Sequence, residues 1–193
     1  MKPVLFLDVM DTIVHDPFRG LPAFFDMSLP ELLRQKHPSA WVEFERGECT
    51  ESEFLANFFS DRRVYDHKGM LALMREGYRW LDGMEPLLQD LAAQGVPMHT
   101  LSNYPVWWKM IEEKLNLSRY VSWTFVSCDH GVRKPQPQAY ECAARAASVN
   151  IKHGVFVDDR ASNCEGARVA GMQAIHFENA AQLRQELQRL EIL

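Results

Sequence analysis

Short apolar segments alternate with amphipathic segments along the second half of the chain. The apolar segments have the length of buried strands and, with one at the start of the chain, comprise residues 4–8, 96–102, 123–128, 154–158 and 173–177. The amphipathic segments repeat apolar residues at helical spacing and comprise residues 105–115, 136–147, 163–170 and 180–190. Strands that alternate with helices predict an α/β fold, a doubly wound, Rossmann-like parallel sheet with helices on both faces.

The region from residue 16 to residue 82 interrupts this alternation. It carries helix signals and no convincing strand; Thr50 and Glu53, for example, have the spacing of a capping box. Turn residues lie at both ends of the region, where hinges are expected. We therefore predict a small helical cap, residues 16–82, inserted after the first strand of a catalytic α/β core formed by residues 1–15 and 83–193.

Composition narrows the class of protein. A chain of 193 residues with 47% hydrophobic and 24% charged residues is typical of a globular domain. A net charge of −5 argues against a nucleic-acid partner, and no apolar run reaches the roughly 20 residues of a membrane span. The four cysteines have no metal-ligand spacing, so we expect free thiols. Because the chain starts at the first strand without a signal or transit segment, we expect a cytoplasmic location, as a monomer or homodimer.

Polar residues follow the predicted strands at their carboxyl ends, which meet at one edge of a parallel sheet. They are Asp8, Ser102 and the pair Asp158-Asp159, and Lys134 lies on a loop that reaches the same edge. Carboxylates this close repel by about 3–4 kcal/mol per pair at an effective dielectric constant of 20, so they need a counter-ion. Mg²⁺ is a suitable cation, and with Lys134 it would let Asp8 attack a phosphate and form an aspartyl-phosphate.

The residues after Ser102 suggest how a phosphate is held. Pro105 suits a first helical position, so we expect a helix N-terminus there that binds the phosphate together with Ser102 and Asn103. Tyr104 is the aromatic residue nearest to this anion site and our best candidate for a wall of the substrate pocket. Lys134 precedes a proline, which favours an extended backbone and presents the ammonium from a stiff loop.

Four segments in this order resemble the four motifs of the haloacid dehalogenase-like hydrolases. They are residues 6–12, 101–103, 133–135 and 155–159. The resemblance implies that family's core fold, that the insertion is its helical cap, and that Mg²⁺ is the cofactor. It also implies roles for individual residues: Asp8 as nucleophile and metal ligand, Met10 as a metal ligand through its backbone carbonyl, Thr12 as the group that orients Asp8, Ser102 and Lys134 as phosphate ligands, Asp159 as a direct metal ligand, and Asp158 as a direct or water-mediated one.

The chain also resembles plant plastid flavin mononucleotide (FMN) hydrolases over essentially its whole length, cap included. This similarity implies an Mg²⁺-dependent phosphomonoesterase that converts FMN into riboflavin and phosphate. Two alternatives stay open at this point. In the first, the chain is a phosphatase for another small phosphorylated metabolite. In the second, it is a protein that binds a phosphorylated ligand or flavin without hydrolysing it.

Position 10 departs from the pattern of phosphatases in this family, which have an acid/base Asp two residues after the nucleophile. Met10 cannot transfer a proton, and acid catalysis of a primary alkoxide's departure typically contributes 10²–10⁴-fold. Either Asp11 reaches in through an altered turn, or a water or a residue such as His15 substitutes, or turnover is slow. True dehalogenases also lack this acid, but they lack the Asp158-Asp159 pair too, so we reject dehalogenation.

Overall fold

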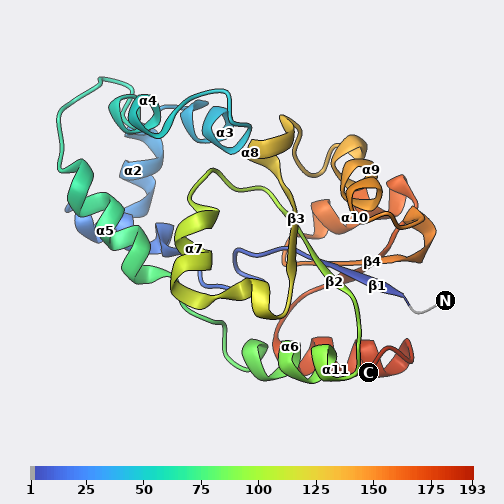
Figure 1. Ribbon diagram of the computed structural model, residues 1–193. Helices are drawn as coiled ribbons and strands as arrows, with labels where there is room; N and C mark the ends of the chain where they lie inside the picture. Colours follow the sequence, from blue (N-terminus) through green and yellow to red (C-terminus); the bar gives the residue numbers. More distant parts are fainter. Residues whose placement is uncertain (1–2) are drawn as a thin grey trace.

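A five-stranded parallel sheet forms the centre of the computed structural model, which describes residues 3–193 (Figure 1). The strand order is β3-β2-β1-β4-β5. The strands are β1 (Val4–Leu7), β2 (Met98–Ser102), β3 (Ser122–Val126), β4 (Gly154–Asp158) and β5 (Gln173–His176). Because β1 is the central strand, the residue that follows it lies at the middle of the sheet edge. The predicted doubly wound α/β sheet is confirmed.

Helices cover both faces of the sheet (Figure 1). The longer ones are α6 (Met84–Ala93), α7 (Trp108–Leu115), α9 (Pro137–Ala146), α10 (Ala161–Ala170) and α11 (Ala180–Arg189), and short turns are η2 (Leu117–Arg119), α8 (Ser127–His130) and η3 (Ile151–His153). Alternation along β1 separates two cores: Leu5 and Leu7 pack with residues of α6, α7 and α11, whereas Phe6 packs with residues of α9 and α10.

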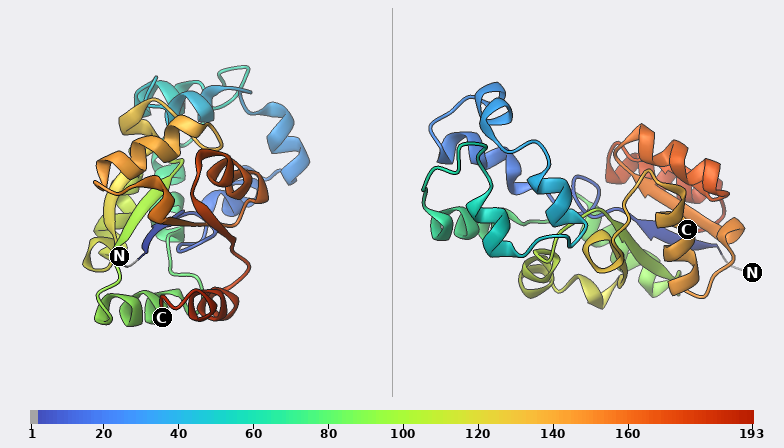
Figure 2. Two further views of the ribbon diagram at one scale, coloured as in Figure 1. Left: turned by 90° about the vertical axis from the view of Figure 1, so that its right-hand side faces the viewer. Right: turned by 90° about the horizontal axis from the view of Figure 1, so that it is seen from above.

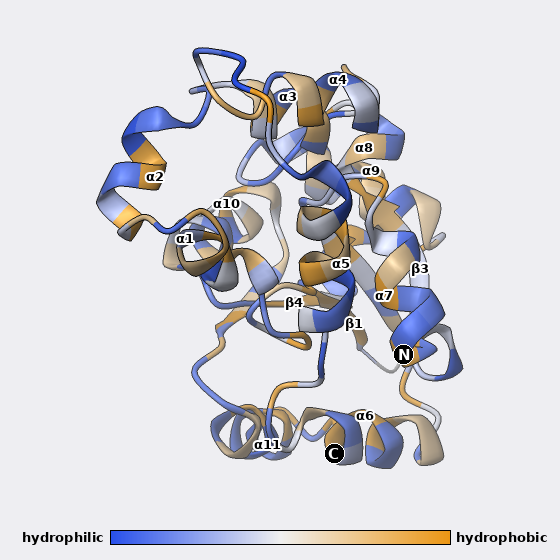
Figure 3. Ribbon diagram, turned by 90° about the vertical axis from the view of Figure 1, so that its left-hand side faces the viewer, coloured by the Kyte–Doolittle hydropathy of each residue, from blue (hydrophilic) through white to orange (hydrophobic). Residues whose placement is uncertain are grey.

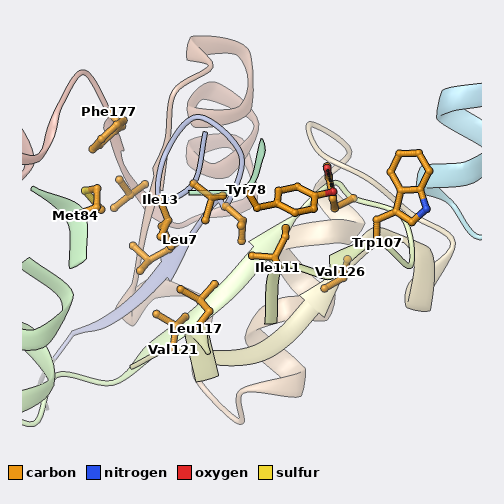
Figure 4. Packing of buried hydrophobic residues seen from close by; sticks show 14 of the residues in the cluster. Leu7, Ile13, Tyr78, Met84, Trp107, Ile111, Leu117, Val121, Val126 and Phe177 are labelled. Carbon is orange, nitrogen blue, oxygen red and sulfur yellow. Dashed lines mark hydrogen bonds between the residues drawn. The ribbon is translucent and has the colours of Figure 1, made fainter. Parts of the chain in front are cut away.

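The larger core continues from the sheet toward the inserted helices. Figure 4 shows it running from Met84 and Phe177, past Leu7 and Ile111, to Trp107. Each such side chain contributes about 1.5–3 kcal/mol when it is fully buried. The sheet and the base of the insertion therefore share one apolar interior.

The named elements of the insertion are all helices, and Lys36 and Phe59 form an isolated antiparallel bridge between them. Its elements are η1 (Pro17–Gly20), α1 (Leu21–Phe24), α2 (Leu29–Gln35), α3 (Ala40–Glu45), α4 (Glu51–Ala56) and α5 (His67–Gly77). They gather at one end of the molecule, away from both termini (Figure 2), and polar and apolar residues alternate along them (Figure 3). The predicted capping box is present, with the Thr50 hydroxyl and the Glu53 carboxylate each bonding the other residue's backbone N–H. Within residues 3–193, no helix combines the length and apolar character needed to span a membrane.

The chain segments that lead into and out of the insertion run side by side. The His15 N–H donates to the Arg79 carbonyl and the Leu81 N–H donates to the Ile13 carbonyl, each at 2.9 Å. This antiparallel contact places the turn after β1 directly beneath the inserted helices. The division at residues 16 and 82 into cap and core stays a prediction.

The structure differs from the sequence expectations at several element boundaries, and it contains a helix that was not expected. Helix α7 begins at Trp108 instead of Pro105. The carbonyls of Pro105 and Val106 accept hydrogen bonds from the N–H groups three residues later, so this segment forms turns before the helix starts. Strand β3 ends at Val126, since Ser127 begins the short helix α8. Helix α6 was not predicted at all.

Gly166 of α10 provides a test of the packing beneath the loop that carries Lys134. A Cβ atom at this position would lie 2.7 Å from the Pro135 carbonyl oxygen and 2.8 Å from the Tyr140 hydroxyl. We expect Gly166→Ala to lower the free energy of unfolding by about 1–2 kcal/mol, because overpacking outweighs the better helix propensity of alanine. Urea unfolding of Gly166→Ala beside Val169→Ala, an exposed position on the same helix, measures this; equal stability of Gly166→Ala and the wild type would contradict it.

Candidate active site

Asp8 and Asp158 lie next to each other because their strands pair in register. Leu7 of β1 lies opposite Val157 of β4, and the Asp8 N–H donates to the Val157 carbonyl at 2.9 Å. Both carboxylates are one residue further along, so alternation points them to the face that carries Phe156. Two acids from distant parts of the sequence thus share one side of the sheet edge.

Lys134 connects these two acids. Its Nζ lies 2.9 Å from Asp8 Oδ1 and 2.7 Å from Asp158 Oδ2, and the side chain is 1% exposed. The ammonium also lies 5.0 Å from the centre of the Phe156 ring. The loop that carries Lys134 therefore reaches the ends of β1 and β4, as the sequence predicts.

The side chain of Asn103 fixes the backbone at Lys134. Asn103 Nδ2 donates to the Lys134 carbonyl at 2.9 Å, and Asn103 Oδ1 accepts the Lys134 N–H at 2.8 Å. We expected Asn103 to bind phosphate. Its amide is instead occupied in holding the lysine loop, so its side chain acts on the site through Lys134.

Asp159 completes a group of three carboxylates with Asp8 and Asp158. Each offers one oxygen, and these oxygens lie within 4.8 Å of one another. Asp158 is fully buried and also accepts the Arg160 N–H at 2.8 Å and the Asn163 amide at 3.0 Å. Asp159 is half-buried and lines the adjoining cavity. Of the pair, Asp159 is thus the acid that faces the cavity.

Burial is the main cause of the shifted pKa values of the acids in this cluster. The pKa of Asp8 is raised to about 7, mainly by burial and to a lesser extent by the charges of Asp158 and Asp159, while Lys134 opposes the increase. Burial alone would lower the pKa of Lys134, but Asp8 and Asp158 outweigh it and the net pKa is raised. Burial, followed by the charge of Asp158, raises the pKa of Asp159. A bound cation would favour the ionised carboxylates.

The donor set fits a hard divalent cation. Three carboxylates against the single ammonium of Lys134 leave a formal charge of −2, and carboxylate oxygen is the ligand that Mg²⁺ prefers. Met10 also lines the cavity, and its side chain packs against the larger core. The role of its backbone carbonyl as a metal ligand stays a prediction.

Ser102 ends strand β2 with a buried, unpartnered hydroxyl. The residue is 0% exposed, and within residues 3–193 its Oγ has no hydrogen-bond partner. A buried hydroxyl without a partner is costly, and a phosphate oxygen would satisfy it. The helix N-terminus that we expected beside it is absent from this position, because α7 starts only at Trp108.

Thr12 has a different partner from the one expected. We predicted that its hydroxyl orients Asp8. In the structure Thr12 Oγ1 accepts the Asp159 N–H at 3.2 Å, so the hydroxyl ties the turn after β1 to the loop after β4. Thr12 therefore helps to place Asp159.

A cavity of about 460 Å³, counted with its open mouth, lies between the sheet edge and the insertion. Its floor holds Asp8 and Asp159, and Trp41 and Tyr104 form an aromatic wall, with ring centres 5.9 Å apart. The Tyr104 hydroxyl shares a hydrogen bond with the Tyr78 hydroxyl at 2.8 Å, which holds the ring in place. Tyr104 thus lines the cavity, and its role as a wall of the substrate pocket stays a prediction.

Comparison with known proteins identifies the family. The model of the haloacid dehalogenase-like hydrolases matches residues 22–171. The chain belongs to this family.

Individual relatives agree with this assignment. The chain is 48% identical over 191 residues to the chloroplastic flavin mononucleotide hydrolase 1 of Arabidopsis thaliana, covering 98% of this chain and 78% of that protein. It is 28% identical over 168 residues to a sesquiterpene phosphatase of Aspergillus oryzae, with 85% of each covered. A HAD family enzyme of Bacteroides thetaiotaomicron, solved with magnesium and inorganic phosphate, has a TM-score of 0.77 at 18% identity, covering 95% of this chain and 99% of that one.

Sequence reasoning missed several residues at the site of this haloacid dehalogenase-like hydrolase. Asp16 and Glu45 line the cavity, and Asn163 braces Asp158. For Glu45 a signal existed: a carboxylate four residues after Trp41, on a helix whose other buried positions are apolar, and its Oε1 accepts the Trp41 indole N–H at 2.8 Å. Arg133 has its guanidinium 2.6 Å from Glu45 Oε2.

Removal of the buried ammonium tests its structural role in the hydrolase core. Lys134→Met leaves Asp8 and Asp158 without their shared cation. Removing one partner of a buried ion pair costs about 3–5 kcal/mol, because the other charge stays buried without compensation. We expect a loss of that size in the free energy of unfolding, measured with urea in the presence of a chelator. The exposed Lys152→Met is the matched control and should unfold like the wild type. An unchanged stability of Lys134→Met would show that the ammonium does not hold the cluster together.

Proposed function

We propose that this hydrolase is an Mg²⁺-dependent phosphomonoesterase that converts FMN into riboflavin and phosphate through an aspartyl-phosphate on Asp8. The observation that carries the proposal is the convergence of Asp8, Lys134 and Asp159 at the floor of one cavity. A carboxylate nucleophile, a fixed ammonium and a carboxylate pair suited to Mg²⁺ are the groups that phosphoryl transfer to an aspartate needs.

The residues of the site have distinct tasks in this reaction. Lys134 and the Ser102 hydroxyl hold phosphate oxygens, which places the phosphorus in front of Asp8. One Asp8 oxygen attacks the phosphorus, the ester bond breaks, and the riboflavin oxygen leaves. Mg²⁺, held by Asp8, Asp159, Asp158 directly or through water, and the Met10 carbonyl, would neutralise the charge that otherwise keeps a carboxylate and a phosphate apart. Water then hydrolyses the aspartyl-phosphate and restores Asp8.

FMN as substrate is supported by two observations. The Arabidopsis thaliana relative, 48% identical over 98% of this chain, is named as a flavin mononucleotide hydrolase, and the match includes the insertion. Trp41 and Tyr104 line the cavity beside Asp8 and Lys134, and an aromatic contact contributes about 0.5–1.5 kcal/mol beyond burial; Tyr104 itself is 2% exposed, so Trp41 is the more accessible ring. We further propose that residues 16–82 act as a cap that covers the bound flavin.

Phosphate release from FMN tests this function. We expect the wild type with Mg²⁺ to yield riboflavin and phosphate in equal amounts. Chromatography measures the riboflavin, and a phosphate assay measures the phosphate. Asp8→Asn should lower kcat by at least about 10³-fold, on the scale seen when a catalytic nucleophile is removed. Asp61→Asn, an exposed change in the insertion, should have wild-type activity.

The alternatives give different results in the same assay. Tight FMN retention without phosphate release would support a binding protein and remove the enzyme proposal. Faster hydrolysis of a sugar phosphate or a sesquiterpenyl phosphate than of FMN would keep the phosphatase and remove FMN as its substrate. Full activity in Asp8→Asn would remove the aspartyl-phosphate mechanism.

Magnesium dependence tests the carboxylate pair. Chelation should abolish phosphate release, and Asp159→Asn should raise the Mg²⁺ concentration for half-maximal activity by at least about 10-fold, since even indirect metal contacts are worth 10–100-fold in affinity. Calorimetric titration of the FMN-free protein with Mg²⁺ gives an independent measurement. Asp129→Asn, an exposed change in α8, serves as control; identical Mg²⁺ affinity in Asp159→Asn would exclude Asp159 as a ligand.

A further inference from the structure

The proposed reaction requires a proton that the nucleophile and its neighbours do not supply. The riboflavin oxygen leaves as a primary alkoxide, and Met10 cannot protonate it. Apart from Asp8 and Asp159, three carboxylates line the cavity: Asp11, Asp16 and Glu45. The geometry of each decides which one is available. This inference rests on the proposed function.

Asp11 is already engaged by its neighbours. Its Oδ2 lies 2.8 Å from the Arg19 guanidinium, and its Oδ1 accepts the Asp16 N–H at 3.2 Å. The backbone of Asp11 is in the left-handed region with a φ of 54°, and its N–H donates to the Val14 carbonyl at 2.7 Å, so the turn holds this side chain in its present direction. Both carboxylate oxygens therefore serve the turn itself.

Glu45 and His15 are unsuitable for different reasons. Glu45 is held by an ion pair, because its Oε2 lies 2.6 Å from the Arg133 guanidinium while its Oε1 accepts the Trp41 indole N–H at 2.8 Å. His15, which we considered from the sequence, lines a separate cavity with Leu81 and Phe177. Neither residue presents a free proton donor toward Asp8.

Asp16 is the remaining acid. Its Oδ1 accepts the Phe18 N–H at 2.9 Å, which fixes the carboxyl at the start of η1, and within residues 3–193 no lysine, arginine or histidine nitrogen forms an ion pair with it. The partly buried side chain lines the cavity that contains Asp8. The charged and titratable groups around it are Asp11, Arg19, Tyr78, Tyr104 and Arg160.

The environment of Asp16 suits a group that exchanges a proton. Burial raises its pKa, the Phe18 N–H opposes this, and the charge of Asp11 adds to the increase. A carboxyl whose protonated form is favoured in this way can donate a proton nearer to neutral pH than an exposed aspartate can.

We propose that Asp16 is the general acid and base of the reaction. As Asp8 Oδ bonds to phosphorus, the bond between phosphorus and the ester oxygen breaks and its electron pair stays on that oxygen. The Asp16 proton moves to the same oxygen, which gives neutral riboflavin and an Asp16 carboxylate. That carboxylate then accepts a proton from the water whose oxygen attacks the aspartyl-phosphate, so phosphate leaves and both aspartates return to their starting state.

Leaving-group dependence tests this proposal. An alkoxide needs a proton to depart, whereas 4-nitrophenolate leaves without one. We expect Asp16→Asn to lower kcat/KM for FMN by about 10²–10⁴-fold and kcat/KM for 4-nitrophenyl phosphate by less than roughly threefold, because this parameter reports the first irreversible step. In rapid mixing, Asp16→Asn should release a burst of one nitrophenolate per protein and then turn over slowly, since the base for the second step is missing.

Matched variants exclude the other acids. Asn at position 16 keeps an oxygen for the Phe18 N–H, and Asp16→Ser, which also caps helices, provides a second variant. Asp11→Asn and Glu45→Gln should lose activity equally on the two esters, if they lose any. A loss in Asp16→Asn and Asp16→Ser that is equal for both esters, or the selective loss of FMN turnover in Asp11→Asn instead, would overturn the proposal. Failure of the wild type to hydrolyse either ester would instead overturn the phosphatase function on which it rests.

Discussion

The contact of one buried ammonium with two buried carboxylates is the constraint on which this site depends. Lys134 touches both Asp8 and Asp158 at hydrogen-bond distance, and all three side chains are almost completely removed from water. Such a cluster is tolerable only while its charges compensate each other. With Asp159 added, negative charge exceeds positive charge. The pKa of Asp8 is raised mainly by burial, and the charges of Asp158 and Asp159 add to this effect. The same imbalance makes the site attractive to a divalent cation.

Strand pairing and strand alternation place the buried carboxylates of this cluster. Pairing of β1 with β4 brings Asp8 beside Asp158, and alternation directs both to the side on which Lys134 lies above Phe156. The lysine loop is held from outside the sheet by the Asn103 amide. Nucleophile, ammonium and acid pair are therefore parts of one rigid edge, and the insertion only has to supply the roof of the cavity.

The site residues that the sequence predicts correctly are those that lie at the carboxyl ends of strands. Asp8, Ser102 and Asp158 follow apolar runs, so their meeting at one edge follows from a parallel sheet alone. Contacts between distant segments carry no such signal: the Ser127 hydroxyl bonds the Glu45 carbonyl across 82 residues, and nothing near either position indicates it. The start of α7 was mispredicted because a proline that suits a helix N-terminus suits the preceding turn equally well.

Methionine at position 10 becomes reasonable once the charge of the cluster is considered. An aspartate there would bring a fourth carboxylate to an edge that already has three of them against one ammonium, and each further like charge raises the cost of ionising the nucleophile. The thioether adds no charge and packs against the larger core. A proton-transferring acid at Asp16 follows the turn after β1, where burial and the charge of Asp11 raise its pKa, while the Phe18 N–H, Arg19 and Arg160 lower it. Separating the acid from the metal-binding edge lets the nucleophile stay ionised while a protonated carboxyl shares its cavity.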